Sequence, residues 1–150
     1  MAFGRIFFTQ GTSSDYQGLS SDILTILEGS FKGRLLEYNP ATGKTRTLIG
    51  ELTSGNGVAL APDESYVLVA DQYRYRIKRY WLKGASSGKE DIFADNLPGF
   101  VHNIYIDDKN TLWAAFNSPR ADIIPHNNPW LKAQLAFATC KFTGARCSTR

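Results

Sequence analysis

Few side chains in this 150-residue sequence have a type and a setting suited to chemistry, and His102 is the clearest of them. An imidazole titrates nearest to neutral pH, so His102 could act as a general base. The sequence assigns no partner carboxylate to it. A histidine that only satisfies a hydrogen bond therefore stays open as the alternative interpretation.

Two stretches resemble catalytic motifs, but the residues around them do not match those motifs. Gly43-Lys44-Thr45 resembles the end of a phosphate-binding loop, but Tyr38 stands where that loop needs its first glycine, and no helix begins here. Ser13 and Ser14 lack a surrounding nucleophile-elbow pattern. Neither nucleotide binding nor serine hydrolysis is indicated.

Composition and charge exclude further classes of protein. With 43% hydrophobic and 21% charged residues, the chain is expected to fold. Its net charge is only +3 and its basic residues are scattered, so nucleic-acid binding is not expected. No run approaches the roughly 18 apolar residues of a membrane span, and the first residues lack the regions of a secretory signal, which leaves the compartment open.

Cys140 and Cys147 are the two cysteines, and no histidine pair lies near them in the spacing of a zinc finger. A zinc site is therefore not expected. A disulfide that closes a small loop and a pair of unpaired thiols both remain open.

Short β-rich runs separated by Gly, Pro, Asn and Asp fill residues 4–116, which predicts an all-β fold of about nine strands. The aromatic and basic side chains of residues 73–80 could suit an RNA surface, but alternation on one of these strands explains them more simply. The expected strands are residues 4–9, 33–38, 44–49, 56–60, 66–70, 76–82, 90–94, 102–106 and 111–116.

A repeat of about 46 residues links these strands. Residues 56–63 and the strand at 66–70 parallel residues 102–108 and the strand that follows them. A unit of roughly 40 to 50 residues that holds four short strands is typical of a propeller blade. We therefore expect one full blade over residues 56–94, the last three strands of the preceding blade over 4–50, and the first two of the next over 102–116.

Two segments between or after the strands have helical patterns. Residues 19–28 have apolar side chains at amphipathic spacing, and residues 129–137 begin with a proline in the first turn. We expect two short helical insertions in an otherwise all-β chain.

An ordered set of motifs resembles one known family. The set comprises residues 33–45 (GRLLEYNPATGKT), 56–63 (NGVALAPD), 76–84 (RIKRYWLKG), 93–100 (FADNLPGF), 112–115 (LWAA) and 128–131 (NPWL). Their order and spacing resemble the strictosidine-synthase-like family, which includes adipocyte plasma membrane-associated proteins. The resemblance covers about residues 5–135, so we expect a partial propeller over 1–135 and a C-terminal tail over 136–150.

The resemblance implies a six-bladed β-propeller, of which this chain holds two to three blades. The ligand site of the family lies at one mouth of the central channel, near the starts of the innermost strands, and takes a small molecule. Family activities differ: amine–aldehyde condensation with a glutamate as acid and base, or hydrolysis of lactones and aryl esters with a bound Ca²⁺. Many members are secretory, vacuolar or membrane-associated.

By the same resemblance, Asn56 matches a family position that binds the cation through oxygen, which suits Ca²⁺. An ordinary turn at Asn56-Gly57 is the alternative. His102 stands where the family has an aspartate, so the cation site loses an anionic oxygen there. Asn56, His102 and Asn103 are the expected ligand-binding residues.

Two functional hypotheses stay open at this point. One is an enzyme of this family, and the other is a non-catalytic truncated product or an interaction module. The resemblance implies that most site segments lie outside these 150 residues. We also expect self-association through exposed strand edges, because an open array of blades leaves them unpaired.

Overall fold

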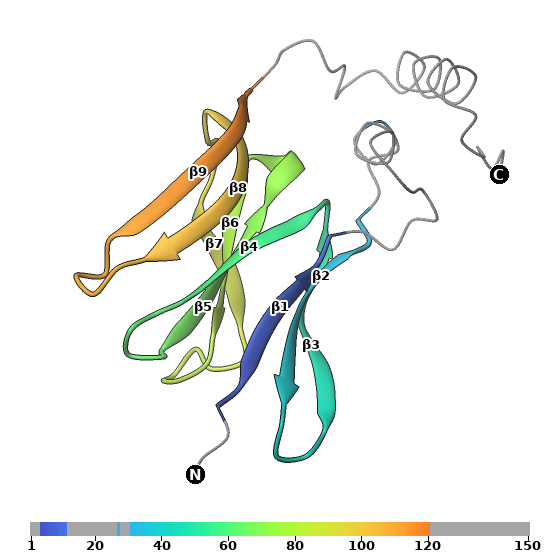
Figure 1. Ribbon diagram of the computed structural model, residues 1–150, viewed down its shortest axis with the longest axis vertical. Helices are drawn as coiled ribbons and strands as arrows, with labels where there is room; N and C mark the ends of the chain where they lie inside the picture. The colour runs from blue at the N-terminus through green and yellow to red at the C-terminus, as the bar shows by residue number, and fades with distance from the viewer. Residues whose placement is uncertain (1–3, 12–26, 28–30, 121–150) are drawn as a thin grey trace, which may run out of the picture. The chain divides into compact units, whose positions relative to one another are not determined.

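The computed structural model describes residues 4–11, 27 and 31–120 (Figure 1). Of the two predicted helical insertions, residues 129–137 lie outside the described residues, and only Leu27 is described within residues 19–28. The predicted C-terminal tail at 136–150 and both cysteines lie outside them as well. No helix in the described ranges is long and apolar enough to cross a membrane.

The described part consists of antiparallel strands, and from residue 33 onward short turns and loops join consecutive strands. A single 3-10 turn, η1 (Gln72–Arg74), joins two of the strands. The strands are β1 (Ile6–Gln10), β2 (Gly33–Asn39), β3 (Lys44–Leu52), β4 (Gly55–Leu60), β5 (Tyr66–Asp71), β6 (Arg76–Trp81), β7 (Glu90–Ala94), β8 (Gly99–Ile106) and β9 (Leu112–Pro119).

Every predicted strand is present in the described residues, so the all-β prediction is confirmed. The strands form three sheets, in the orders β1-β2-β3, β4-β5-β6-β7 and β8-β9. These match the predicted three, four and two strands of consecutive blades. The strand ends differ by at most three residues: β3 and β9 each end three residues later than predicted. β8 begins at Gly99 instead of His102 because Gly99 pairs with Pro119 at the far end of β9.

The turns follow the side-chain chemistry that predicted them. Between β2 and β3, the backbone oxygen of Asn39 accepts from the amide of Gly43 at 2.9 Å, and Gly43 has a φ of 66°, a conformation that favours glycine. After β4, Asp63 Oδ1 accepts from the Ser65 amide at 2.9 Å. After β8, Asp107 Oδ1 accepts from the Thr111 amide at 2.8 Å, so an aspartate carboxylate stabilises both turns, although from different positions in the turn.

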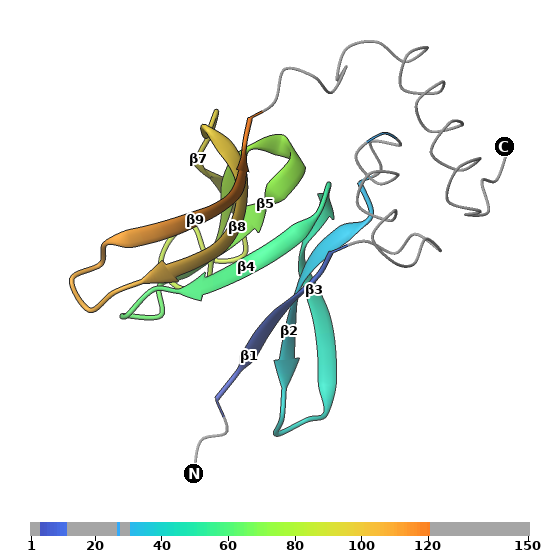
Figure 2. The ribbon, with the colours of Figure 1, turned by 45° about the horizontal axis from the view of Figure 1, so that its top comes forward.

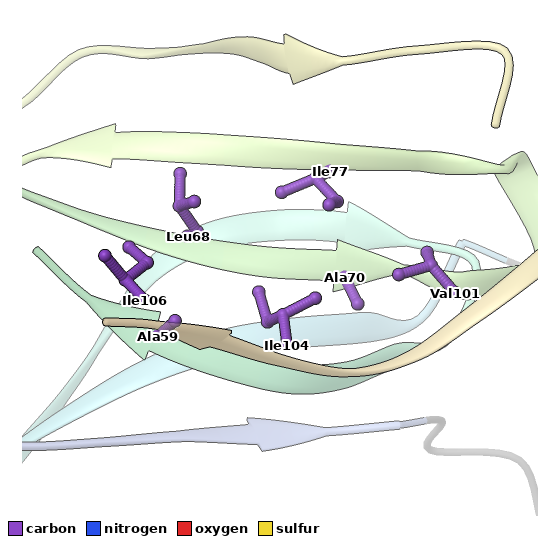
Figure 3. Packing of buried hydrophobic residues seen from close by; sticks show 7 residues of the cluster. All are labelled: Ala59, Leu68, Ala70, Ile77, Val101, Ile104 and Ile106. Atoms are coloured by element: carbon purple, nitrogen blue, oxygen red, sulfur yellow. The ribbon is translucent and has the colours of Figure 1, made fainter. Parts of the chain in front are cut away.

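One hydrophobic core lies between the sheet of β4–β7 and the sheet of β8–β9. Alternate residues of β5 and β8 face each other across it because successive side chains of a strand point to opposite faces (Figure 3). Its buried members are Ala59, Leu68, Ala70, Ile77, Val101, Ile104 and Ile106.

A second core lies on the other face of β5. Val67 and Val69, which alternate with Leu68 and Ala70, pack there against the first sheet. The partners from that sheet are Leu35, Ile49 and Leu52, each with no exposed surface. The sheet of β4–β7 is therefore covered on both faces.

The three sheets are stacked in chain order, and β4 lies beside both β1 and β8 (Figures 1 and 2). Sheets packed face to face with their first strands side by side form the arrangement of propeller blades. The start of β4 and the start of β8 consequently lie at the same end of the stack, where the sequence places its candidate site residues.

Candidate functional site

Asn56, near the start of β4, connects three segments of the chain. Its backbone oxygen accepts from Thr9 Oγ1 of β1 at 2.8 Å. Its side-chain Nδ2 donates to Gln72 Oε1 of η1 at 2.9 Å. This bond fixes the orientation of the amide and leaves Asn56 Oδ1 without a hydrogen-bond partner among the described residues. The free oxygen is the atom that a donor group or a hard cation would contact.

Gly57 brings β4 into backbone contact with β8. A Cβ atom at Gly57 would lie 2.6 Å from both the backbone oxygen of His102 and the backbone nitrogen of Ile104. Gly57 lies inside a strand and does not have a positive φ, so the interpretation of Asn56-Gly57 as an ordinary turn is wrong. Glycine is required here because the two strands approach closely.

This contact places the predicted site residues together. Asn56 precedes Gly57, and His102 and Asn103 lie directly against it on β8. The His102 side chain is half-buried and the Asn103 side chain is exposed. Neither side chain has a hydrogen bond to any residue in the described ranges.

Gln72 is a site residue that the sequence reasoning missed. Its side chain is only 5% exposed, and its Oε1 accepts from Asn56. Its Nε2 donor has no acceptor among the residues that the structure describes. A buried donor without a partner costs about 1–3 kcal/mol, so a ligand oxygen or a water molecule at this position would be stabilising.

Asp71 holds the surroundings of Gln72 in place. Its fully buried carboxylate accepts from the amide of Thr53 at 2.8 Å, from Thr53 Oγ1 at 2.6 Å and from Arg76 Nε at 2.8 Å. These bonds tie the residues before β4 to the turn after β5. Because both carboxylate oxygens are already engaged, Asp71 supports the site and is not free to bind a ligand.

An aromatic group borders the site where η1 meets β8. The ring of Phe100 stacks on Tyr75 with a centroid distance of 4.9 Å and meets Tyr73 edge-on at 5.6 Å. Tyr75 ends η1 in the left-handed conformation, with a φ of 54°. These contacts position η1, and with it Gln72, against the start of β8.

The described residues fit a calcium ion in donor type but not in number. Ca²⁺ takes six to eight oxygen ligands, usually with carboxylates among them. At this end of the stack, the free amide oxygens of Asn56 and Asn103 are suitable donors. Over residues 4–11 and 31–120, however, no group of three or more His, Cys, Asp or Glu residues could hold a metal ion.

Comparisons with known proteins agree with this arrangement. A family model described as strictosidine synthase matches residues 2–85. Strictosidine synthase-like 13 of Arabidopsis thaliana is 36% identical over 132 residues, which cover 87% of this chain and 32% of that protein. The adipocyte plasma membrane-associated protein of Rattus norvegicus is 37% identical over 122 residues, which cover 79% and 31%. The chain thus spans about a third of the length of these curated relatives.

Solved structures with a similar fold are β-propellers. A luciferin-regenerating enzyme matches 75% of this chain and 36% of its own, with a TM-score of 0.58 and 19% identity. A gluconolactonase of Xanthomonas campestris matches 77% and 38%, with a TM-score of 0.56 and 16% identity. These likenesses concern the fold alone and confirm the predicted partial propeller. Since the family model covers more than half of the sequence, the chain belongs to the strictosidine synthase family.

Proposed function

We propose that this chain supplies part of the small-molecule site of a propeller enzyme, and that the site hydrolyses a small ester or lactone. The observation that carries the proposal is the placement of His102. Its half-buried imidazole has no hydrogen-bond partner in the described part of the chain, and its backbone lies against Gly57, next to Asn56. The gluconolactonase among the similar structures supports a hydrolytic reaction.

In this proposal, His102 acts as a general base. It would take a proton from a water molecule while the water oxygen attacks the carbonyl carbon of the substrate. The Gln72 Nε2 donor would stabilise the negative charge that develops on the carbonyl oxygen. The proton held on His102 would then pass to the departing oxygen, so that an ester gives a carboxylic acid and an alcohol and a lactone gives a hydroxy acid.

Amine–aldehyde condensation is less well supported by the described residues. That reaction in the family uses a carboxylate as acid and base. Asp71 is the buried carboxylate next to Gln72, and its two oxygens already accept three hydrogen bonds. The imidazole of His102 and the amides at this end of the stack suit hydrolysis better.

Calcium binding is a separate proposal. Asn56 Oδ1 would contribute one amide oxygen to the ion, and by the family resemblance the other ligands would come from segments outside these 150 residues. A bound cation would polarise the substrate carbonyl. No step of the hydrolysis proposed above depends on it.

The test is hydrolysis of phenyl acetate and γ-butyrolactone by the full chain. Replacing His102 with alanine should lower the rate at least 100-fold, the usual minimum contribution of a general base. His126→Ala is the matched control because it removes the other histidine of the sequence and should leave the rate unchanged. Equal rates for the wild type and His102→Ala would refute the role of His102.

Absence of turnover with either substrate would favour the non-catalytic alternative, an interaction module. Addition of a chelator tests the calcium proposal independently. Loss of activity on chelation and its recovery with Ca²⁺ would support it, and unchanged activity would contradict it.

A further inference from the structure

Arg74, the last residue of η1, differs from every other arginine in the described part of the chain. It has neither a hydrogen bond nor an ion pair to any described residue, so its charge is uncompensated there and its N–H donors are unused. Each of the others has such a partner. Arg5, Arg46, Arg76 and Arg79 pair with carboxylates, and Arg34 and Arg120 donate to the side-chain amide oxygens of Gln10 and Asn96.

The guanidinium of Arg74 is nevertheless held in place. Its Cζ lies 4.0 Å from the centroid of the Phe31 ring, and the residue is half-buried. Stacking uses the flat face of the guanidinium and leaves the N–H groups at its edge, where they can form two parallel bonds to a carboxylate. A group that is already positioned loses less freedom when a ligand binds.

The backbone of η1 is anchored on both sides of Arg74. The Gln72 amide donates to the backbone oxygen of Ser54, just before β4, at 3.0 Å. The backbone oxygen of Tyr75 accepts from the Leu97 amide at 2.8 Å. Arg74 therefore has a fixed position, two residues after the Gln72 donor of the candidate site.

The ring under Arg74 belongs to the segment that leads into β2, close to the start of β4. Phe31 comes two residues before Gly33, and an added Cβ at Gly33 would lie 3.0 Å from the backbone nitrogen of Gly55. Gly55 directly precedes Asn56. The stacked pair of Arg74 and Phe31 thus joins η1 to the first sheet next to the segment that carries Asn56.

Arg76 shows how the same segment treats an arginine with a structural role. Arg76 is also half-buried, but its Nε donates at 2.8 Å to the fully buried Asp71, so its charge is compensated within the chain. Arg74 has a similar degree of burial without such a partner in the described residues. A ligand carboxylate would supply the missing negative charge.

We propose that the substrate of the candidate site carries a carboxylate in addition to its ester or lactone group, and that Arg74 binds this carboxylate. The inference rests on the proposed hydrolysis and names its substrate class. Arg74 would select and orient the substrate, whereas His102 and Gln72 would act on the reacting carbonyl.

The kinetic test compares phenyl acetate with the monophenyl esters of succinic, glutaric and adipic acids, each hydrolysed by the full chain. These three anionic esters hold the carboxylate at increasing distances from the reacting carbonyl, so one of them should reach Arg74. For that ester, Arg74→Gln should lower kcat/KM roughly tenfold or more, the loss expected for hydrogen bonds between charged groups. Hydrolysis of phenyl acetate should be unchanged, which also shows that the variant is folded.

Arg34→Gln is the matched control, because it removes one positive charge from the same end of the stack. The Arg34 side chain donates to Gln10 on the face of β2 opposite Leu35, which lies in the second core. This variant should hydrolyse all four esters as the wild type does. Arg74→Lys keeps the charge without the planar fork and should recover only part of the loss.

A binding measurement separates this inference from the proposed hydrolysis. Hydrocinnamate carries a phenyl ring and a carboxylate but no ester, and hydrocinnamamide is its neutral counterpart. Amide chemical shifts in NMR titrations of the full chain should show tighter binding of hydrocinnamate, and Arg74→Gln should remove the difference. That result without hydrolysis of any ester would support the carboxylate site and contradict the proposed hydrolysis.

Two results would overturn the inference. The first is a kcat/KM for all three anionic esters that is the same in the wild type and in Arg74→Gln, while hydrolysis of phenyl acetate still depends on His102; the proposed hydrolysis would then stand alone. The second is an equal loss in Arg34→Gln and Arg74→Gln, which would assign the effect to the general charge of this end of the stack.

Discussion

Replacement of Gly57 by alanine should strongly destabilise the stack of sheets. The new Cβ would lie 2.6 Å from the His102 oxygen and the Ile104 nitrogen, whereas ordinary contact begins at 3.4 Å. The strands β4 and β8 would have to separate by about 0.8 Å. Because both neighbouring atoms belong to the backbone, no side-chain rotation can relieve the clash.

The size of the effect follows from this forced displacement. Overpacking in a well-packed region costs about 1–3 kcal/mol. Because the neighbouring atoms are rigid, we expect Gly57→Ala to lower the free energy of unfolding by about 3 kcal/mol. For a chain of this length, such a loss lowers the melting temperature by about 6–12 °C. Urea-induced unfolding followed by tryptophan fluorescence and a thermal scan measure the two quantities.

Gly50→Ala is the control for this substitution. Gly50 also lies in a strand and does not have a positive φ, but an added Cβ there meets no atom within 4 Å. Its replacement should be neutral or slightly stabilising, since alanine restricts the unfolded chain more than glycine does. Equal free energies of unfolding for the Gly57→Ala and Gly50→Ala variants would refute the close approach of β4 and β8.

Three further substitutions test other parts of the account. Leu68→Ala empties part of the first core and should lower the free energy of unfolding by about 2–5 kcal/mol in urea titrations. Asp71→Ala leaves the Arg76 guanidinium without its carboxylate and should cost about 3–5 kcal/mol in the same assay. Asp71→Glu should also be destabilising, because its longer side chain displaces the carboxylate from its three hydrogen bonds. A hydrogen bond from Trp113 lowers the pKa of Asp107. The ionised carboxylate therefore stabilises the folded state at pH values above the pKa of Asp107 in the unfolded chain. This stabilisation is lost as the pH falls through the pKa of Asp107 in the folded chain. Asp107→Asn should therefore flatten the fall in melting temperature on acidification, and an unchanged slope would contradict this origin.

Local chemistry made the strands and turns predictable. The residues that form the turn at 39–43 are all local. The oxygens of Asn39 accept hydrogen bonds from the backbone amides of residues 41–43, and Gly43 adopts the positive φ that the turn needs. The β7 prediction at residues 90–94 matches the observed strand at both ends. The predicted strand at residues 102–106 begins three residues after the observed start of β8, because the pairing of Gly99 with Pro119 depends on a distant part of the chain.

The site was only partly predictable, for a related reason. Asn56, His102 and Asn103 came from the family resemblance, and the structure brings their segments together through Gly57. Their catalytic, ligand-binding and metal roles remain proposals. Gln72 carries no recognisable motif, and its burial and its bond to Asn56 arise from the position of η1 beside β8.

The side-by-side placement of β4 and β8 brings the candidate site together, and nuclear Overhauser effects in the full chain test it most directly. A cross-peak between the α protons of Gly57 and the amide proton of Ile104 is expected, because a Cβ at Gly57 would lie 2.6 Å from the Ile104 nitrogen. Cross-strand peaks between Ala59 and Leu68 report that the middle sheet is folded. Presence of the Ala59–Leu68 peaks without the Gly57–Ile104 peak would contradict the account.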